Sequence, residues 1–338
     1  MTRPVQAGPD TSTDRPGRTS PVRALAAIDW AFVGRRVGQA TIAIAFLWSL
    51  GLFSQALHPE TIFDDAILYW RATQAWVNGG DPWSVTYDSV IFGGIPPTLL
   101  VNLPLLPFGE GIARPFWALA DLWGAVAMIR YFRLPLWWIC FPPLLEAWLA
   151  GSPDPALGGL VVVGGGAIAA FTKPYMIGAM LADRRWKALA IAAVLGVVTL
   201  PLLPWGRFID EYSTHVAPAF AALSHYKSFG DVPVLIPVAL LALVVLRRTG
   251  VSLAVSTLWP HSQWHYAMLS MGVISRSTIL TIGFSLPLLW AGPVSVLVLA
   301  AVVAGQGLWP RWQARRSAGA SSAGSVAEAP APPASPAP

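Results

Sequence analysis

The stretch "ALAIAAVLGVVTLPLLP", residues 188–204, contains no charged side chain and a single hydroxyl group. A hydrocarbon layer about 30 Å thick is crossed by about 20 apolar residues in a helix. Backbone groups left unpaired in lipid are too costly for an open, non-helical segment. The stretch therefore predicts a helix that contacts lipid.

The composition of the whole chain supports the same class of protein. Of 338 residues, 55% are hydrophobic and only 12% are charged, and 17 are Trp. One soluble globule cannot bury that much apolar surface. We therefore expect an all-α, polytopic membrane protein with roughly 10 to 12 transmembrane helices.

The expected spans follow from the apolar segments. The clearest are 37–57, 113–131, 134–150, 155–171, 188–204, 232–246, 277–291 and 293–309. Four further segments are too short to cross alone and predict tilted, broken or re-entrant pieces: 96–108, 175–182, 251–259 and 264–274.

The two ends of the chain differ from its middle. Residues 1–34 are rich in Pro, Ser, Thr and Arg and lack the apolar core of a secretory signal, and residues 313–338 are almost entirely Ala, Pro, Ser and Gly. Neither composition can bury a core, so both predict disordered tails. Residues 35–312 form the expected transmembrane domain, with an acidic extracytoplasmic loop at 58–95.

The basic residues indicate topology. The formal charge is +5, but the basic residues sit in short clusters at the ends of apolar segments, which argues against a nucleic-acid partner. The positive-inside rule then predicts a multi-pass protein of the cell membrane with both termini in the cytoplasm. The clusters are Arg35-Arg36, Arg184-Arg185-Lys187, Arg247-Arg248 and Arg311-Arg315-Arg316.

The single cysteine, Cys140, excludes an internal disulfide framework. The five histidines are scattered apart from the segment "HSQWH", residues 261–265, so the sequence predicts no metal site and no cofactor.

The loop at 58–95 contains "FDDAILYWRATQAWVNGGDPW", residues 63–83. Asp65 and Tyr69 are four residues apart and share one helical face, and Gly79-Gly80 predicts the end of that helix. Two interpretations of the paired acids remain open. Asp64 caps an ordinary amphipathic loop helix, or the acids carry chemistry at the membrane surface.

Residues 65–83, "DAILYWRATQAWVNGGDPW", resemble the acidic-helix motif of glycosyltransferase family 87, the membrane transferases that use polyprenyl-phosphate sugars. Three further segments resemble the family in the same order. They are "IFGGIPPTLLVNLPLLPFG" at 91–109, "FTKPYMIGAMLADRRWKAL" at 171–189 and "STLWPHSQWHY" at 256–266. The chain departs from the family at Trp83, where the family has Tyr, and in the spacing of its histidines.

The resemblance implies the C-type membrane glycosyltransferase architecture and an inverting transfer. A sugar, for which we expect mannose, would move from a polyprenyl-phosphate donor to a glycolipid or glycan acceptor of the cell envelope. Asp65 matches the family's catalytic Asp, and such chemistry needs a carboxylate to take the acceptor proton. The alternative interpretation is that Asp65 is a helix cap or a paired surface acid.

Three residues are candidates for binding the donor phosphate. Lys173 interrupts an apolar run, which predicts a functional cation, although a lysine there could also mark the cytoplasmic end of a span. His261 and His265 follow Pro260 with helical spacing, so a helix start and two imidazoles could face an anion. The alternative is that both histidines belong to an interfacial aromatic belt.

The remaining polar residues of the loop are weaker candidates. Asp64, Arg71, Asp81 and Asp88 either support Asp65 and shape the acceptor site or are solvated loop charges. The glycine-rich segment at 157–170 lacks the Lys and Ser/Thr of a phosphate loop and predicts close helix packing.

Two other classes of function fit the composition. A lipid or small-molecule transporter or flippase also has broken helices and charges within the membrane, but no internal repeat is evident. A non-catalytic membrane scaffold is the second alternative.

Overall fold

The computed structural model describes residues 30–56, 62–88, 90–219, 250–259 and 264–286, together with residues 240, 243, 244, 247, 312, 314 and 315. The chain divides into two units, residues 1–41 and residues 42–338. In the first unit only the start of helix α2 is described, where Thr41 donates a hydrogen bond to the carbonyl of Val37. The remaining observations concern the second unit.

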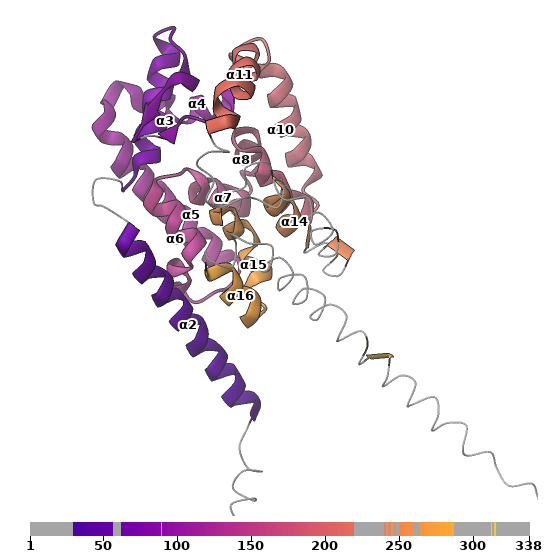
Figure 1. Ribbon diagram of the computed structural model, residues 1–338. Helices are drawn as coiled ribbons and strands as arrows, with labels where there is room; N and C mark the ends of the chain where they lie inside the picture. The colour runs from indigo at the N-terminus through magenta and orange to yellow at the C-terminus, as the bar shows by residue number, and fades with distance from the viewer. Residues whose placement is uncertain are drawn as a thin grey trace, which may run out of the picture. The chain divides into compact units, whose positions relative to one another are not determined.

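The described part of the chain is almost entirely helical (Figure 1). Its α-helices are α2 (Trp30–Ala56), α3 (Asp64–Val77), α4 (Pro96–Asn102), α5 (Ala113–Tyr131), α6 (Pro142–Ala150), α7 (Asp154–Val163), α8 (Gly166–Thr172), α9 (Ile177–Ala182), α10 (Trp186–Thr199), α11 (Trp205–Glu211), α14 (Gly250–Leu258), α15 (Met271–Ile274) and α16 (Thr278–Ser285). Short 3-10 or π turns are η2 (Pro82–Ser84), η3 (Leu103–Phe108), η4 (Glu110–Ile112), η5 (Leu136–Cys140), η6 (Pro174–Met176), η7 (Tyr212–Val216) and η10 (Trp264–Ser270). The expectation of an all-α protein is confirmed.

Helix α5 has the bounds that the sequence predicts, 113–131. Together with the preceding turn it forms the one helix, among the residues described, that is both long and apolar enough to cross a membrane, Glu110–Tyr131. Helix α2 ends at Ala56, one residue before the predicted end of the first span. The predicted spans at 232–246 and 293–309 lie almost wholly outside the described residues.

Two predicted spans are not continuous helices. Residues 134–150 divide into η5 and α6 because Pro142 and Pro143 have no N–H to donate and can only start a new helix. Residues 155–171 divide into α7 and α8 at Gly164, whose φ of 106° is left-handed and ends α7. The prediction of an unbroken helix was wrong in both places. It rested on apolar composition, which does not reveal where proline or glycine ends a helix.

Helices α5 and α7 pack closely at the centre of the main hydrophobic core. Gly124 of α5 faces Gly159 of α7, and a side chain at either glycine would collide with the other helix. Asp121 of α5 accepts a hydrogen bond from the backbone N–H of Ala156 at 3.1 Å, which fixes the start of α7. The predicted role of the glycine-rich segment in close packing is confirmed at Gly159.

The predicted loop at 58–95 is structured in its described part. It contains α3, the η2 turn and a two-stranded antiparallel pair, β1 (Thr86–Tyr87) and β2 (Val90–Ile91), which the sequence reasoning did not anticipate. Gly79 has φ 77° directly after α3, so the predicted stop at Gly79-Gly80 is confirmed. The pair and the turn pack on one side of α3 through Trp83 and Phe92.

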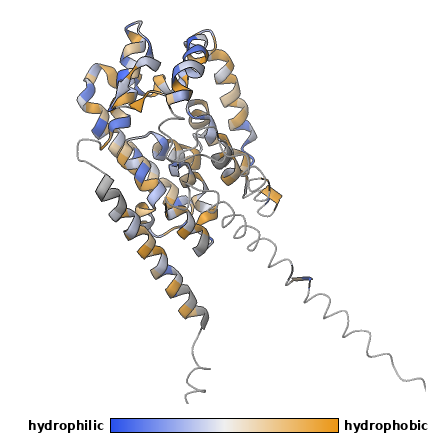
Figure 2. Ribbon diagram, viewed as in Figure 1, coloured by the Kyte–Doolittle hydropathy of each residue, from blue (hydrophilic) through white to orange (hydrophobic). Residues whose placement is uncertain are grey.

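Helix α10 consists almost entirely of apolar residues and is largely orange in Figure 2. Ile191, Val194, Val197 and Val198 are each 53–65% exposed, and only Thr199 of this helix is buried. Ala188, Leu189 and Ala192 are half-buried against the main hydrophobic core, so one face of α10 is packed and the other exposes apolar side chains. The predicted helix at 188–204 is confirmed as far as Thr199 and stops before Pro201.

Candidate functional site

Helix α3 places Asp65 and Tyr69 on the face that the sequence predicts. The helix starts after Phe63, which has a left-handed backbone and whose N–H donates to the Leu149 carbonyl at 2.8 Å. Gly151 lies against Phe63 so closely that a Cβ would sit 2.8 Å from its Cα. This contact fixes the first turn of α3 against the end of α6.

Asp65 and Tyr69 face a cavity of about 230 Å³. Its walls come from α3, β2, α4, the end of α8, η6, α11 and η7, and Lys173 lies in the wall between α8 and η6. The aromatic side chains of the wall are Tyr69, Tyr175, Phe208, Tyr212, Trp259 and Tyr266. A half-buried cavity with aromatic walls, one acid and one cation has the character of a small-molecule site.

The carboxylate of Asp65 makes no hydrogen bond or ion pair with any other residue in the described ranges. Burial raises the pKa of Asp65 to about 6, and the positive charges of Lys173 and His265 oppose that rise. A carboxylate without a fixed partner and with a pKa near neutrality can accept a proton from a bound ligand.

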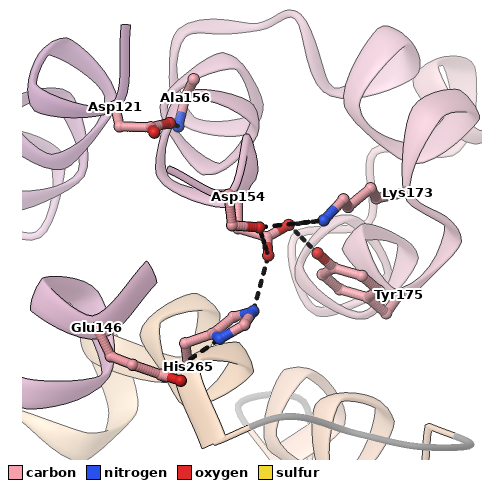
Figure 3. A network of polar contacts seen from close by, with 8 residues as sticks. Asp121, Glu146, Asp154, Ala156, Lys173, Tyr175 and His265 are labelled. Carbon is pink, nitrogen blue, oxygen red and sulfur yellow. Dashed lines mark hydrogen bonds and ion pairs between the residues drawn. The ribbon is translucent and has the colours of Figure 1, made fainter. Parts of the chain in front are cut away.

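Asp154, the first residue of α7, is in the opposite situation (Figure 3). It is fully buried, and its Oδ1 atom lies 2.9 Å from Lys173 Nζ and accepts a hydrogen bond from the Tyr175 hydroxyl. Its Oδ2 atom accepts a hydrogen bond from Ser152 Oγ at 2.8 Å and lies 2.8 Å from His265 Nε2. Four partners therefore hold this carboxylate, which makes it an anchor and not a free base.

The polar network continues from Asp154 to α6. His265 Nδ1 lies 3.1 Å from Glu146 Oε2, so each ring nitrogen of His265 faces a carboxylate. Both nitrogens can donate only in the imidazolium form, which this pair of carboxylates favours. Glu146, His265, Asp154 and Lys173 then form a series of alternating charges that ends at the cavity.

Lys173 is the member of this series that reaches the cavity. Its side chain is 10% exposed and its Nζ lies 3.3 Å from Ser152 Oγ and 5.3 Å from the centre of the Tyr69 ring. The backbone at Lys173 is extended between α8 and η6, and the Nζ atom lies 5.9 Å from the centre of the Tyr175 ring of η6. Lys173 and Asp65 therefore share one cavity, although 108 residues separate them in the printed sequence.

The other predicted residues lie elsewhere or make different contacts. His265 is buried between the two carboxylates and does not line the cavity, and His261 lies outside the described residues. Asp64 lies 3.3 Å from Arg114 Nη2, and Arg71 binds Glu110 through two hydrogen bonds of 2.8 and 3.0 Å.

Asp81 accepts a hydrogen bond from the backbone N–H of Trp83 at 3.1 Å and so caps the η2 turn. Asp64 is not the cap of α3, because Phe63 occupies that position and no side chain caps the helix. The alternative interpretation of Asp64 as the N-cap was therefore wrong.

The sequence reasoning missed four polar residues of the network, Glu146, Ser152, Asp154 and Tyr175. A signal for two of them was present, since Glu146 and Asp154 are acids at or within apolar segments, and such acids are costly unless they are paired. Ser152 and Tyr175 carried no such signal, because hydroxyl groups are common in these segments.

No family model, curated protein or solved structure matches this chain. The chemistry of the cavity is therefore what indicates function.

Proposed function

We propose that this protein is a membrane glycosyltransferase that moves a sugar, mannose in the first instance, from a polyprenyl phosphate to a hydroxyl group of a cell-envelope glycolipid or glycan. The observation that carries the proposal is the meeting of Asp65 and Lys173 at one cavity. A base without a fixed partner and a buried cation are the two groups that such a transfer needs. The motif resemblance of residues 65–83 to family 87 supports the same activity.

The transfer divides between the two sides of the cavity. Asp65 would take the proton of the acceptor hydroxyl as its oxygen bonds to the anomeric carbon, while the bond between that carbon and the donor phosphate oxygen breaks. The leaving phosphate gains negative charge, which Lys173 would stabilise. Attack opposite the leaving phosphate inverts the anomeric centre.

The aromatic wall supports a sugar as the transferred group. Tyr175 and Tyr266 stack with ring centres 3.9 Å apart, and Lys173 Nζ lies over the Tyr69 ring. Flat aromatic faces suit the apolar C–H face of a sugar ring, and the tyrosine hydroxyls suit its polar edge. The Tyr175 hydroxyl donates a hydrogen bond to Asp154, which ties this ring to the buried network.

The exposed surface supports a membrane location. Helix α10 exposes Ile191, Val194, Val197 and Val198 on one face, and α5 exposes Phe116, Leu119 and Trp123 by 40–69%. Exposing apolar surface of this kind to water is unfavourable, whereas contact with lipid chains is favourable. The proposed donor is itself a lipid, so a site beside an apolar surface suits its polyprenyl chain.

The contacts at the ends of α5 and α10 support the predicted orientation of the protein in the membrane. The start of α5 packs against α3, and α10 runs from the basic turn Arg184–Lys187 toward α11, whose Arg207 donates to the Gly80 carbonyl at 3.0 Å. The basic turn therefore lies at the end of these helices that is away from Asp65. With the basic turn in the cytoplasm, the Asp65 cavity would open on the extracytoplasmic side.

The direct test is to incubate the purified full-length protein with radiolabelled polyprenyl-phosphate mannose and a membrane lipid extract. We expect the label to move into a new lipid or glycan product, and we expect Asp65→Asn to abolish that product. A transporter or flippase would instead move intact donor across a vesicle membrane without breaking the sugar–phosphate bond. Intact donor in every incubation, with the wild-type protein folded, would contradict the proposal.

A further inference from the structure

A second cavity of about 240 Å³ lies at the other end of α5. The first turn of α5 packs near Ile67 and Trp70 of α3, whereas Tyr131, its last residue, lines this second cavity. A helix of this length spans about 27 Å, so the two cavities are separate sites.

The lining changes in character from the floor to the rim. The floor is formed by buried residues that are mainly apolar, Met128, Val161 and Leu269, with Ser252 beside them. The rim carries Tyr131, Asp183 and Arg276, all of which are exposed. An apolar interior under a polar rim matches a ligand with an apolar chain and a polar head.

The rim is basic overall. Asp183 Oδ2 lies 3.0 Å from Arg185 Nη2 and accepts a hydrogen bond from the Tyr131 hydroxyl, so its charge is already paired. Arg276 forms no ion pair with any residue in the described ranges. Further basic residues adjoin the lining residues in sequence: Arg130, Arg133 and Arg184.

We propose that this second cavity binds the acyl chain of an anionic phospholipid, with the phosphate head at Arg276. The proposal rests on the membrane location in the proposed function but not on sugar transfer. Basic pockets between helices at the cytoplasmic side are suited to anionic lipid heads, and the apolar floor excludes a free phosphate as the whole ligand. A phospholipid contacts both parts of the cavity, because its acyl chain fits the apolar floor and its phosphate fits Arg276 at the rim.

The test places the full-length protein in vesicles that contain a phosphatidylglycerol with a photoreactive group in its acyl chain. A second set of vesicles contains a phosphatidylcholine with the same chain. After irradiation, mass spectrometry measures the label on peptides that carry Val161, Leu269 or Val273. We expect several-fold more label from phosphatidylglycerol than from phosphatidylcholine.

Two variants separate the head and chain contacts. Arg276→Gln should lower phosphatidylglycerol labelling about fivefold, the effect of one basic residue near an anionic surface, and leave phosphatidylcholine labelling unchanged. Val162→Phe should lower labelling by both lipids because it narrows the cavity. The controls are Arg36→Gln, an exposed arginine of α2, and Leu119→Phe, an exposed position of α5 away from this cavity.

Equal labelling by the two lipids, or no difference between Arg276→Gln and Arg36→Gln, would overturn the proposal. Labelling is measured without a sugar donor and is expected to be normal in Asp65→Asn. A protein that fails to transfer sugar but shows the expected labelling would therefore contradict the proposed function and support the lipid site.

Discussion

The two faces of α3 both carry charged side chains, but in different surroundings. On one face Asp65 and Tyr69 line a cavity, and no fixed partner occupies the Asp65 carboxylate among the described residues. On the other face Arg71 is bound to Glu110, and the side chains of this pair are 41% and 37% exposed. The comparison shows that burial and pairing, and not the presence of charge alone, distinguish the charged side chains of the two faces.

The sharpest test of this comparison is to neutralise each acid of α3 in turn. We expect Asp65→Asn to slow transfer about 100- to 10,000-fold, because Asn cannot take a proton from the acceptor. Asp64→Asn is the matched control and should retain most activity, since Asp64 faces Arg114 and not the cavity. The measurement is the initial rate with labelled donor, with folding checked by size-exclusion chromatography. If Asp64→Asn were the inactive variant, the general base would be on the face of Asp64 and not on the face of Asp65.

A second test compares buried and exposed ion pairs by stability. Asp154→Asn should cost about 3 to 5 kcal/mol in the free energy of unfolding, because it leaves Lys173 and His265 buried beside a neutral group. Glu110→Gln breaks the exposed pair with Arg71 and should cost about 1 kcal/mol or less. Denaturation in detergent micelles, followed by tryptophan fluorescence, measures both.

The double variant Asp154→Asn with Lys173→Met checks the cause of that loss. Removing both charges should restore part of the stability that Asp154→Asn loses, because no unpaired ammonium then remains buried. If Asp154→Asn and Glu110→Gln lowered the free energy of unfolding equally, the buried network would stabilise the fold no more than the exposed ion pair does.

The third test concerns the cation of the cavity. Lys173→Gln removes one charge-assisted contact to the donor phosphate, worth about 2 to 3 kcal/mol, and should weaken donor use roughly 30- to 150-fold. Asp154 keeps its Ser152, Tyr175 and His265 partners, so the fold should persist. The measurement is kcat/KM for the donor, with Arg71→Gln as the control from the other face of α3. Normal kcat/KM in Lys173→Gln would remove Lys173 from the proposed phosphate site.

The smallest effect is a pH dependence. Burial raises the pKa of Asp65 to about 6, and a general base acts only when it is deprotonated. The value of kcat/KM should therefore be level above pH 6 and fall about tenfold per pH unit as the pH drops below it. Asp64→Asn should leave this inflection in place. A rate that stays level down to about pH 5 would mean that the Asp65 carboxylate titrates at its ordinary value of 3.8 or is not the base.

Much of the local structure could be predicted from the sequence. The bounds of α5, the helix at 188–199, the face shared by Asp65 and Tyr69 and the stop at Gly79 all follow from composition and spacing within a few turns of chain. The failures at Pro142 and Gly164 are also local in origin, because a helix cannot continue through residues that lack a donor or that adopt a left-handed backbone. Pro142, Pro143 and Gly164 are therefore sufficient to predict both breaks.

The composition of the cavity could be predicted only in part. Asp65 and Lys173 were identified singly, one from its motif and one from its cost in an apolar segment, and the structure brings both to one cavity. The sequence predicted that His265 binds the donor phosphate, but in the structure both of its ring nitrogens face carboxylates and not the cavity. Asp154, which joins Lys173 to His265, was not identified at all.

The sequence by itself determined an apolar, helical chain whose polar residues are few and placed near helix ends. Only the tertiary structure decided which of those residues are partners. His265 meets Glu146 from 119 residues away, and Lys173 meets Ser152 from 21 residues away. Helical periodicity reports which side chains share a face over a few residues, whereas these pairings depend on how α6, α7, η6 and η10 pack together. That packing gives Asp154 four partners and leaves the Asp65 carboxylate at the cavity without one among the described residues.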